Sequence, residues 1–117
     1  MIRRLTLAGA LVGASLALAL PAVAAPSATG VTVTAGKPSE FKFTLSKTSV
    51  AKGAATFTLT NKGRLPHNFR IAGKATPVLK AGKQATLKVA LKAGKAAFLC
   101  TVPGHAAAGM KGVLTVK

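Results

Sequence analysis

Acidic residues are almost absent from this chain of 117 residues: Glu40 is the only one, against 17 lysines and arginines, and the formal net charge is +16. A surface with this charge attracts anions, so acidic proteins, anionic lipid headgroups and nucleic acids are all candidate partners. Lysines that keep a domain soluble and protect the edges of its sheets would give the same composition. The charge alone therefore leaves the partner open.

Tryptophan and tyrosine are missing altogether. Each phenylalanine falls on the apolar face of an alternating run, so we expect all five in the core: Phe41, Phe43, Phe57, Phe69 and Phe98. No aromatic platform is left on which bases could stack, which removes the usual sequence support for binding single-stranded nucleic acid. We expect no specific nucleic-acid partner, although duplex binding by charge alone stays open.

A long apolar run occurs only at the N-terminus. Arg3 and Arg4 precede an uncharged apolar run at residues 5–20, and small residues follow at 22–24. This order is typical of a secretion signal peptide with its cleavage site. A membrane anchor fits less well, because the run is shorter than the roughly 20 residues that a span needs and ends in Pro21.

The signal divides the chain into three parts. We predict a signal peptide at residues 1–24 with cleavage near Ala24, a short tether at 25–29, and one domain at 30–117. Removal of Arg3 and Arg4 leaves the mature chain at +14. The protein is therefore expected in the periplasm or outside the cell.

Apolar and polar residues alternate with a period of two along the predicted domain. Phe41, Phe43 and Leu45 share one face, for example, as do His67, Phe69 and Ile71. Glycines separate the runs at spacings typical of strand turns, and no helical period appears. The pattern predicts an all-β fold, an antiparallel sandwich or barrel of seven to eight strands.

Cysteine occurs once, at Cys100, so the chain cannot form an internal disulfide. In an oxidising compartment an unpaired thiol is either a liability or a residue kept for its chemistry. The neighbouring residues favour chemistry, since His105 and Met110 follow at the spacing Cys-x4-His-x4-Met. With His67 upstream, a thiolate, two imidazoles and a thioether form a set that suits copper in electron transfer.

Each of these residues also has a plainer interpretation. A lone buried histidine is ordinarily satisfied by the backbone, and a buried cysteine or methionine is ordinarily a hydrophobic core residue. A cysteine beside a histidine can act as a nucleophile, but that would leave Met110 without a role and supply no oxyanion pocket. Zinc could also occupy a thiolate and two imidazoles, although the general order of affinities favours copper.

The loop from Cys100 to Met110, together with Pro66, His67, Asn68 and Phe69, resembles the ligand segments of the cupredoxins, the plastocyanin/azurin-like type 1 (blue) copper proteins. The resemblance implies a Greek-key sandwich and one copper ion. It further implies His67, Cys100 and His105 as equatorial ligands, Met110 as a long axial ligand, and the backbone of Asn68 as a donor to the cysteine sulfur. The loop spacing matches neither plastocyanin nor azurin, so the subfamily stays open.

By this resemblance the protein is expected to carry single electrons and not to be an enzyme. Its partners would be redox proteins with an acidic docking surface, anionic lipid would bind weakly at most, and the chain would be a monomer. Copper storage or delivery without electron transfer is the main alternative. A cationic surface-binding module with an incidental metal site is a third.

Overall fold

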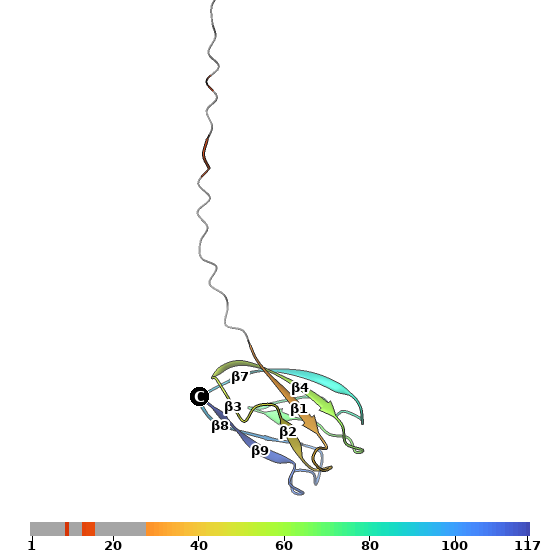
Figure 1. The fold of residues 1–117 in the computed structure, drawn as a ribbon. Helices are drawn as coiled ribbons and strands as arrows, with labels where there is room; N and C mark the ends of the chain where they lie inside the picture. Colours follow the sequence, from red (N-terminus) through yellow and green to blue (C-terminus); the bar gives the residue numbers. More distant parts are fainter. Residues whose placement is uncertain (1–8, 10–12, 16–27) are drawn as a thin grey trace, which may run out of the picture.

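The computed structural model of the protein describes residue 9, residues 13–15 and residues 28–117 (Figure 1). Most of the predicted signal peptide lies outside these residues and stays a prediction. The described part contains nine strands and no helix, and so no helix that could cross a membrane. The strands are β1 (Thr29–Ala35), β2 (Phe43–Leu45), β3 (Ser49–Val50), β4 (Gly53–Asn61), β5 (Arg70–Ile71), β6 (Lys74–Ala75), β7 (Gln84–Leu91), β8 (Gly94–Leu99) and β9 (Lys111–Val116).

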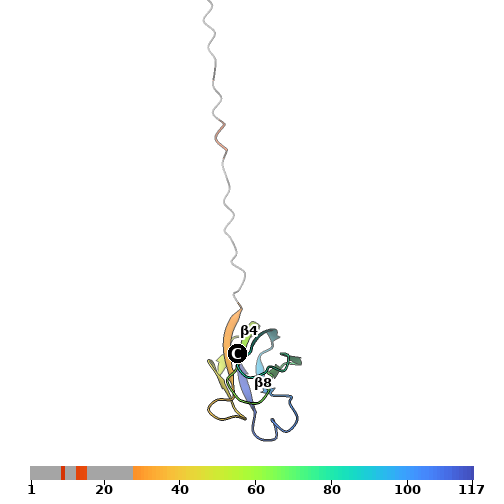
Figure 2. The same cartoon turned by 90° about the vertical axis from the view of Figure 1, so that its right-hand side faces the viewer.

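The strands form two sheets, which confirms the predicted all-β sandwich class. One sheet has four strands in the order β2-β1-β4-β7, and the other has five in the order β3-β9-β8-β5-β6. Strands β4 and β8 belong to different layers in Figure 2. Alternate side chains of both sheets point inward, as the period of two predicts.

Two features of the sheets differ from the prediction. The sheets are mixed and not purely antiparallel, because β1 pairs with β4, and β3 with β9, in parallel. Residue alternation reports which face a strand buries but not its direction, which the connections decide. There are nine strands and not seven to eight, because β3, β5 and β6 are separate pieces of only two residues each.

A cluster of aromatic rings fills the core beneath the metal-ligand segments. The Phe69 ring lies 5.4 Å from Phe43, 5.3 Å from Phe57 and 5.4 Å from Phe98, measured between ring centroids. Phe57, Phe69 and Phe98 are buried, whereas Phe41 and Phe43 are half-buried. Burying a phenylalanine stabilises a fold by about 1.5–3 kcal/mol. This cluster gives the segment that begins at His67 a rigid support.

Candidate metal centre

His67 lies in the segment between β4 and β5, where the backbone holds it on both sides. Its amide donates to the carbonyl of Leu79 at 3.1 Å, and the amide of Leu79 donates back to the carbonyl of His67 at 2.8 Å. Cys100 follows directly after β8, and His105 and Met110 lie in the connection to β9. Two segments far apart in the sequence therefore supply the candidate ligands.

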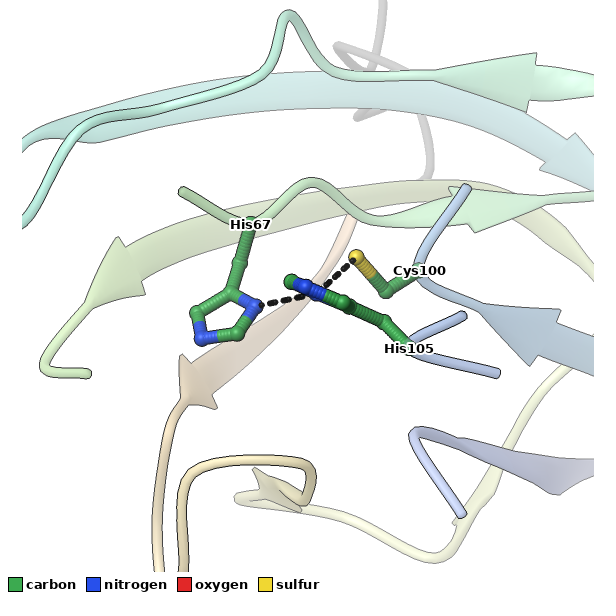
Figure 3. A group of neighbouring side chains, drawn as sticks. All are labelled: His67, Cys100 and His105. Atoms are coloured by element: carbon green, nitrogen blue, oxygen red, sulfur yellow. Dashed lines mark hydrogen bonds between the residues drawn. The ribbon is translucent and has the colours of Figure 1, made fainter. Parts of the chain in front are cut away.

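The side chains of His67, Cys100 and His105 converge on one point (Figure 3). The Nδ1 atoms of the two histidines are 3.1 Å apart, and the Cys100 sulfur is 3.6 Å from Nδ1 of His105. The donor atoms of all three lie within 4.8 Å of one another, and the residues are at most 8% exposed. Two ligand bonds of about 2.0–2.3 Å to one ion would span the separations of 3.1 and 3.6 Å.

The connection from Cys100 to Met110 is closed by its own backbone hydrogen bonds. The amide of Cys100 donates to the carbonyl of Met110, and the amide of Met110 donates to the carbonyl of His105, both at 3.1 Å. Gly104 and Gly109 have φ angles of 82° and 110°, which other residues rarely adopt. Met110 is fully buried. The loop thus returns His105 and Met110 to the position of Cys100.

Asn68 connects the two ligand segments through its side chain. Its Nδ2 donates to Oγ1 of Thr101, and its Oδ1 accepts from the amide of Thr101, both at 2.7 Å. These bonds fix the residue after His67 to the residue after Cys100. The expected donation from the backbone of Asn68 to the cysteine sulfur stays a prediction.

Glu40 belongs to this centre, although no pattern in the sequence relates it to the candidate ligands. Its Oε1 lies 2.8 Å from Nε2 of His67, and its carboxylate accepts from the amides of Leu65 at 2.8 Å and Arg64 at 3.0 Å. The amides of Arg64 and then Leu65 lower the pKa of Glu40 from 4.5 to about 2. Its status as the sole acid was the one available signal.

Burial lowers the pKa of His105 below its ordinary value of 6.5. Desolvation is the main cause, a positive charge on His67 acts in the same direction, and Glu40 opposes both. The Phe41 ring meets the imidazole edge-on at a centroid distance of 5.0 Å. The neutral imidazole is therefore favoured, and this is the form that binds metals.

Fold and centre together define a small copper-binding sandwich protein. The chain belongs to the plastocyanin/azurin family of copper binding proteins, since the model of that family matches residues 29–117. This confirms the resemblance to the cupredoxins and copper as the cofactor. The donor set observed here, two imidazoles and a thiolate, fits that metal.

Several solved structures share the fold. Auracyanin from Roseiflexus castenholzii is 24% identical over 78% of this chain and 98% of its own, with a TM-score of 0.62. Auracyanin A from Chloroflexus aurantiacus, a "blue" copper protein, is 19% identical over 78% and 100% (TM-score 0.65). Rusticyanin from Thiobacillus ferrooxidans is 22% identical over 80% and 79% (TM-score 0.67). No curated protein is detectably similar in sequence.

Proposed function

We propose that this protein is an exported carrier of single electrons with a type 1 copper site made by His67, Cys100, His105 and Met110. The observation that carries the proposal is the convergence of two Nδ1 atoms and one sulfur at a buried point. Copper bound there would supply a one-electron couple. Structures of an auracyanin reduced with dithionite and of reduced rusticyanin support a redox role for proteins of this fold.

The protein contributes fixed positions for the donor atoms and excludes water from them. His67 is fixed by its bridge to Leu79, and Cys100 by its bond to Met110. The Asn68 side chain joins the two segments. Because these hydrogen bonds hold both ligand segments, the donor atoms need to move little when the charge of the metal changes. Small movements favour fast electron transfer.

Burial of the cysteine argues against catalysis at this site. Cys100 is 1% exposed, so a substrate could not reach its sulfur in this conformation. A nucleophilic thiolate needs an accessible position beside a general base. An electron needs only a short path to the surface, and His105, at 8% exposed, is the most accessible of the three ligands.

The surface next to the ligands suits brief docking of an acidic partner. Exposed residues adjacent to the two histidines in the chain are small or apolar: Leu65, Pro66, Pro103, Ala107 and Ala108. Two positive charges lie beside them. Arg64 is exposed, and Nζ of Lys42 lies next to Gly109, 3.0 Å from where a Cβ on that glycine would be. An acidic redox protein would be steered by the charge and seated on the neutral surface.

Localisation and the remaining partner assignments belong to the same proposal. Export to the periplasm or beyond depends on the signal at residues 1–24. N-terminal sequencing of protein from the exporting cell should find a mature chain that begins at Ala25. Gel filtration should give a monomer, and anionic vesicles should retain the protein only at low salt.

The decisive experiment is the visible spectrum of the purified protein with copper(II), followed by voltammetry. Intense blue or green colour and a reversible couple are expected, and Cys100→Ser should abolish the colour. Lys88→Gln, an exposed change on β7, is the control and should leave it intact. Absence of a reversible couple, with ready loss of copper to a weak chelator, would instead indicate storage or delivery.

A further inference from the structure

The only acidic side chain of the sequence, Glu40, contacts one histidine. The sequence contains 17 lysines and arginines. Among the described residues, however, the salt-bridge contact of Glu40 is with His67, at 2.8 Å. Its other hydrogen bonds go to the amides of Arg64 and Leu65, just before His67. The histidine is fully buried, whereas the Glu40 side chain is 27% exposed.

This contact selects the tautomer of His67. An ionised carboxylate can only accept hydrogen bonds, so Nε2 of His67 must carry the hydrogen. A neutral imidazole has one N–H, so Nδ1 keeps its lone pair. Nδ1 is the atom that faces His105 and the cysteine sulfur in Figure 3. The contact with Glu40 therefore leaves the lone pair on Nδ1 of His67, which faces the position where copper would bind.

Two glycines provide the space for this contact. A Cβ on Gly63 would lie 2.7 Å from Oε1 of Glu40 and 2.8 Å from Nε2 of His67, so any side chain there would separate the pair. Gly36, with φ at 85°, presses against the backbone of Gly63, which a Cβ on Gly36 would overlap. The close approach of the carboxylate to the imidazole thus depends on the absence of side chains at Gly36 and Gly63.

A buried asparagine holds the same loop in place. Asn61 is 0% exposed; its Oδ1 accepts from the amide of Gly63, and its Nδ2 donates to the carbonyls of Leu65 and Leu79, each at 2.9 Å. Leu79 is the residue that bridges His67. Asn61 therefore positions both the glycine beside the carboxylate and the backbone partner of the histidine.

We propose that Glu40 is a positioning residue of the copper site, one that fixes the Nε2–H tautomer of His67 and places a negative charge behind that ligand. The inference rests on the proposed function. A carboxylate on the far nitrogen makes an imidazole a stronger donor. The charge also stabilises the more positive oxidation state of a nearby ion. Glu40 thus raises the affinity for copper(II) and lowers the reduction potential.

The test compares the wild type with Glu40→Gln, which keeps the size of the side chain and removes its charge. Copper(II) affinity, measured by competition with a chelator, should fall roughly 10- to 100-fold, and the midpoint potential should rise. Lys88→Gln, which also changes the charge by one, should alter neither. Unchanged affinity and potential in Glu40→Gln would overturn the proposal.

A second measurement needs neither the variant nor copper. Long-range nitrogen–proton NMR of the metal-free wild type should show the hydrogen of His67 on Nε2. A hydrogen on Nδ1 would overturn the proposal even if Glu40→Gln did not fold. Because this readout is independent of any redox couple, failure of the electron-carrier function would show in the voltammetry of the wild type and leave the tautomer result standing.

Discussion

His67 and His105 face each other through the same ring atom, Nδ1, at a distance of 3.1 Å. Two Nδ1 atoms can be this close only if one donates a hydrogen and the other accepts it. Glu40 accepts from the Nε2–H of His67, so in the neutral form of His67 the acceptor is Nδ1 of His67 and the donor is Nδ1 of His105. Two of the candidate ligands are thus joined to each other by a hydrogen bond.

The first prediction concerns the hydrogen of His105. In the metal-free protein it should reside on Nδ1, and on metal binding it should move to Nε2, because a ligating Nδ1 carries no hydrogen. Zinc(II) suits the measurement, since it is diamagnetic and accepts the same donors. Nitrogen NMR before and after zinc should show the change at His105 and none at His67. A change at His67 would contradict this arrangement.

The second prediction is a loss of stability of the metal-free protein in two stages on acidification. The pKa of His105 is lowered in the folded state, so the unfolded chain takes up its proton first and stability falls as the pH drops below 6.5. The pKa of Glu40 is about 2 when folded, against 4.5 ordinarily, so its contribution is complete above 4.5 and is lost between 4.5 and 2. Urea unfolding at about pH 7.5, 5.5 and 3 measures both stages.

Glu40→Gln is the control for the lower stage. The variant should be less stable than the wild type near neutral pH and should lack the decline that Glu40 causes below pH 4.5. If both proteins lose stability equally between pH 4.5 and 2, the decline has another origin.

The third prediction concerns Asn61, whose side chain makes three hydrogen bonds in a fully buried position. Asn61→Ala leaves their partners unsatisfied, and such losses cost about 1–3 kcal/mol. We expect the free energy of unfolding in urea to fall by about 2–3 kcal/mol. Gln84→Ala, which removes one exposed hydrogen bond to Thr60, should change it by less than about 0.5 kcal/mol. Similar losses in both variants would contradict the role of Asn61.

The fourth prediction is the salt dependence of electron transfer. With an acidic redox protein as partner, the second-order rate constant from stopped-flow measurements should fall at least about tenfold as salt rises from low to physiological concentration. Lys42→Gln should reduce the rate at low salt more than Lys88→Gln, because Lys42 lies beside the ligand loop at Gly109. A flat salt response would show that the lysines serve another purpose.

Alternation along the strands predicted which side chains enter the core. His67 shares a face with Phe69 and Ile71, as expected, and all three are buried; Cys100 and Phe98 are buried likewise. The sequence also brought together His67, Cys100 and His105 as one set, and the structure places their donor atoms side by side. Regular strands transmit this information, because every second residue must face the same way.

Irregular segments carry no such periodic information about which way a side chain points. The roles of Glu40 and Asn61 therefore could not be predicted from the sequence. Glu40 lies in the connection between β1 and β2, where no period relates it to His67, 27 residues later. Asn61, at the end of β4, has the inward parity of Phe57 and Leu59, but an asparagine before a glycine-containing turn indicates the turn and hides the buried role.

The placement of Glu40 leaves the exterior of the protein almost without negative charge. The one carboxylate is occupied beside His67, while lysines and arginines are spread over the strands and turns. Two copies that meet therefore repel each other through their net positive charge, and most strongly in dilute buffer. If the protein carries electrons as proposed, electron self-exchange between copies should accordingly be slow.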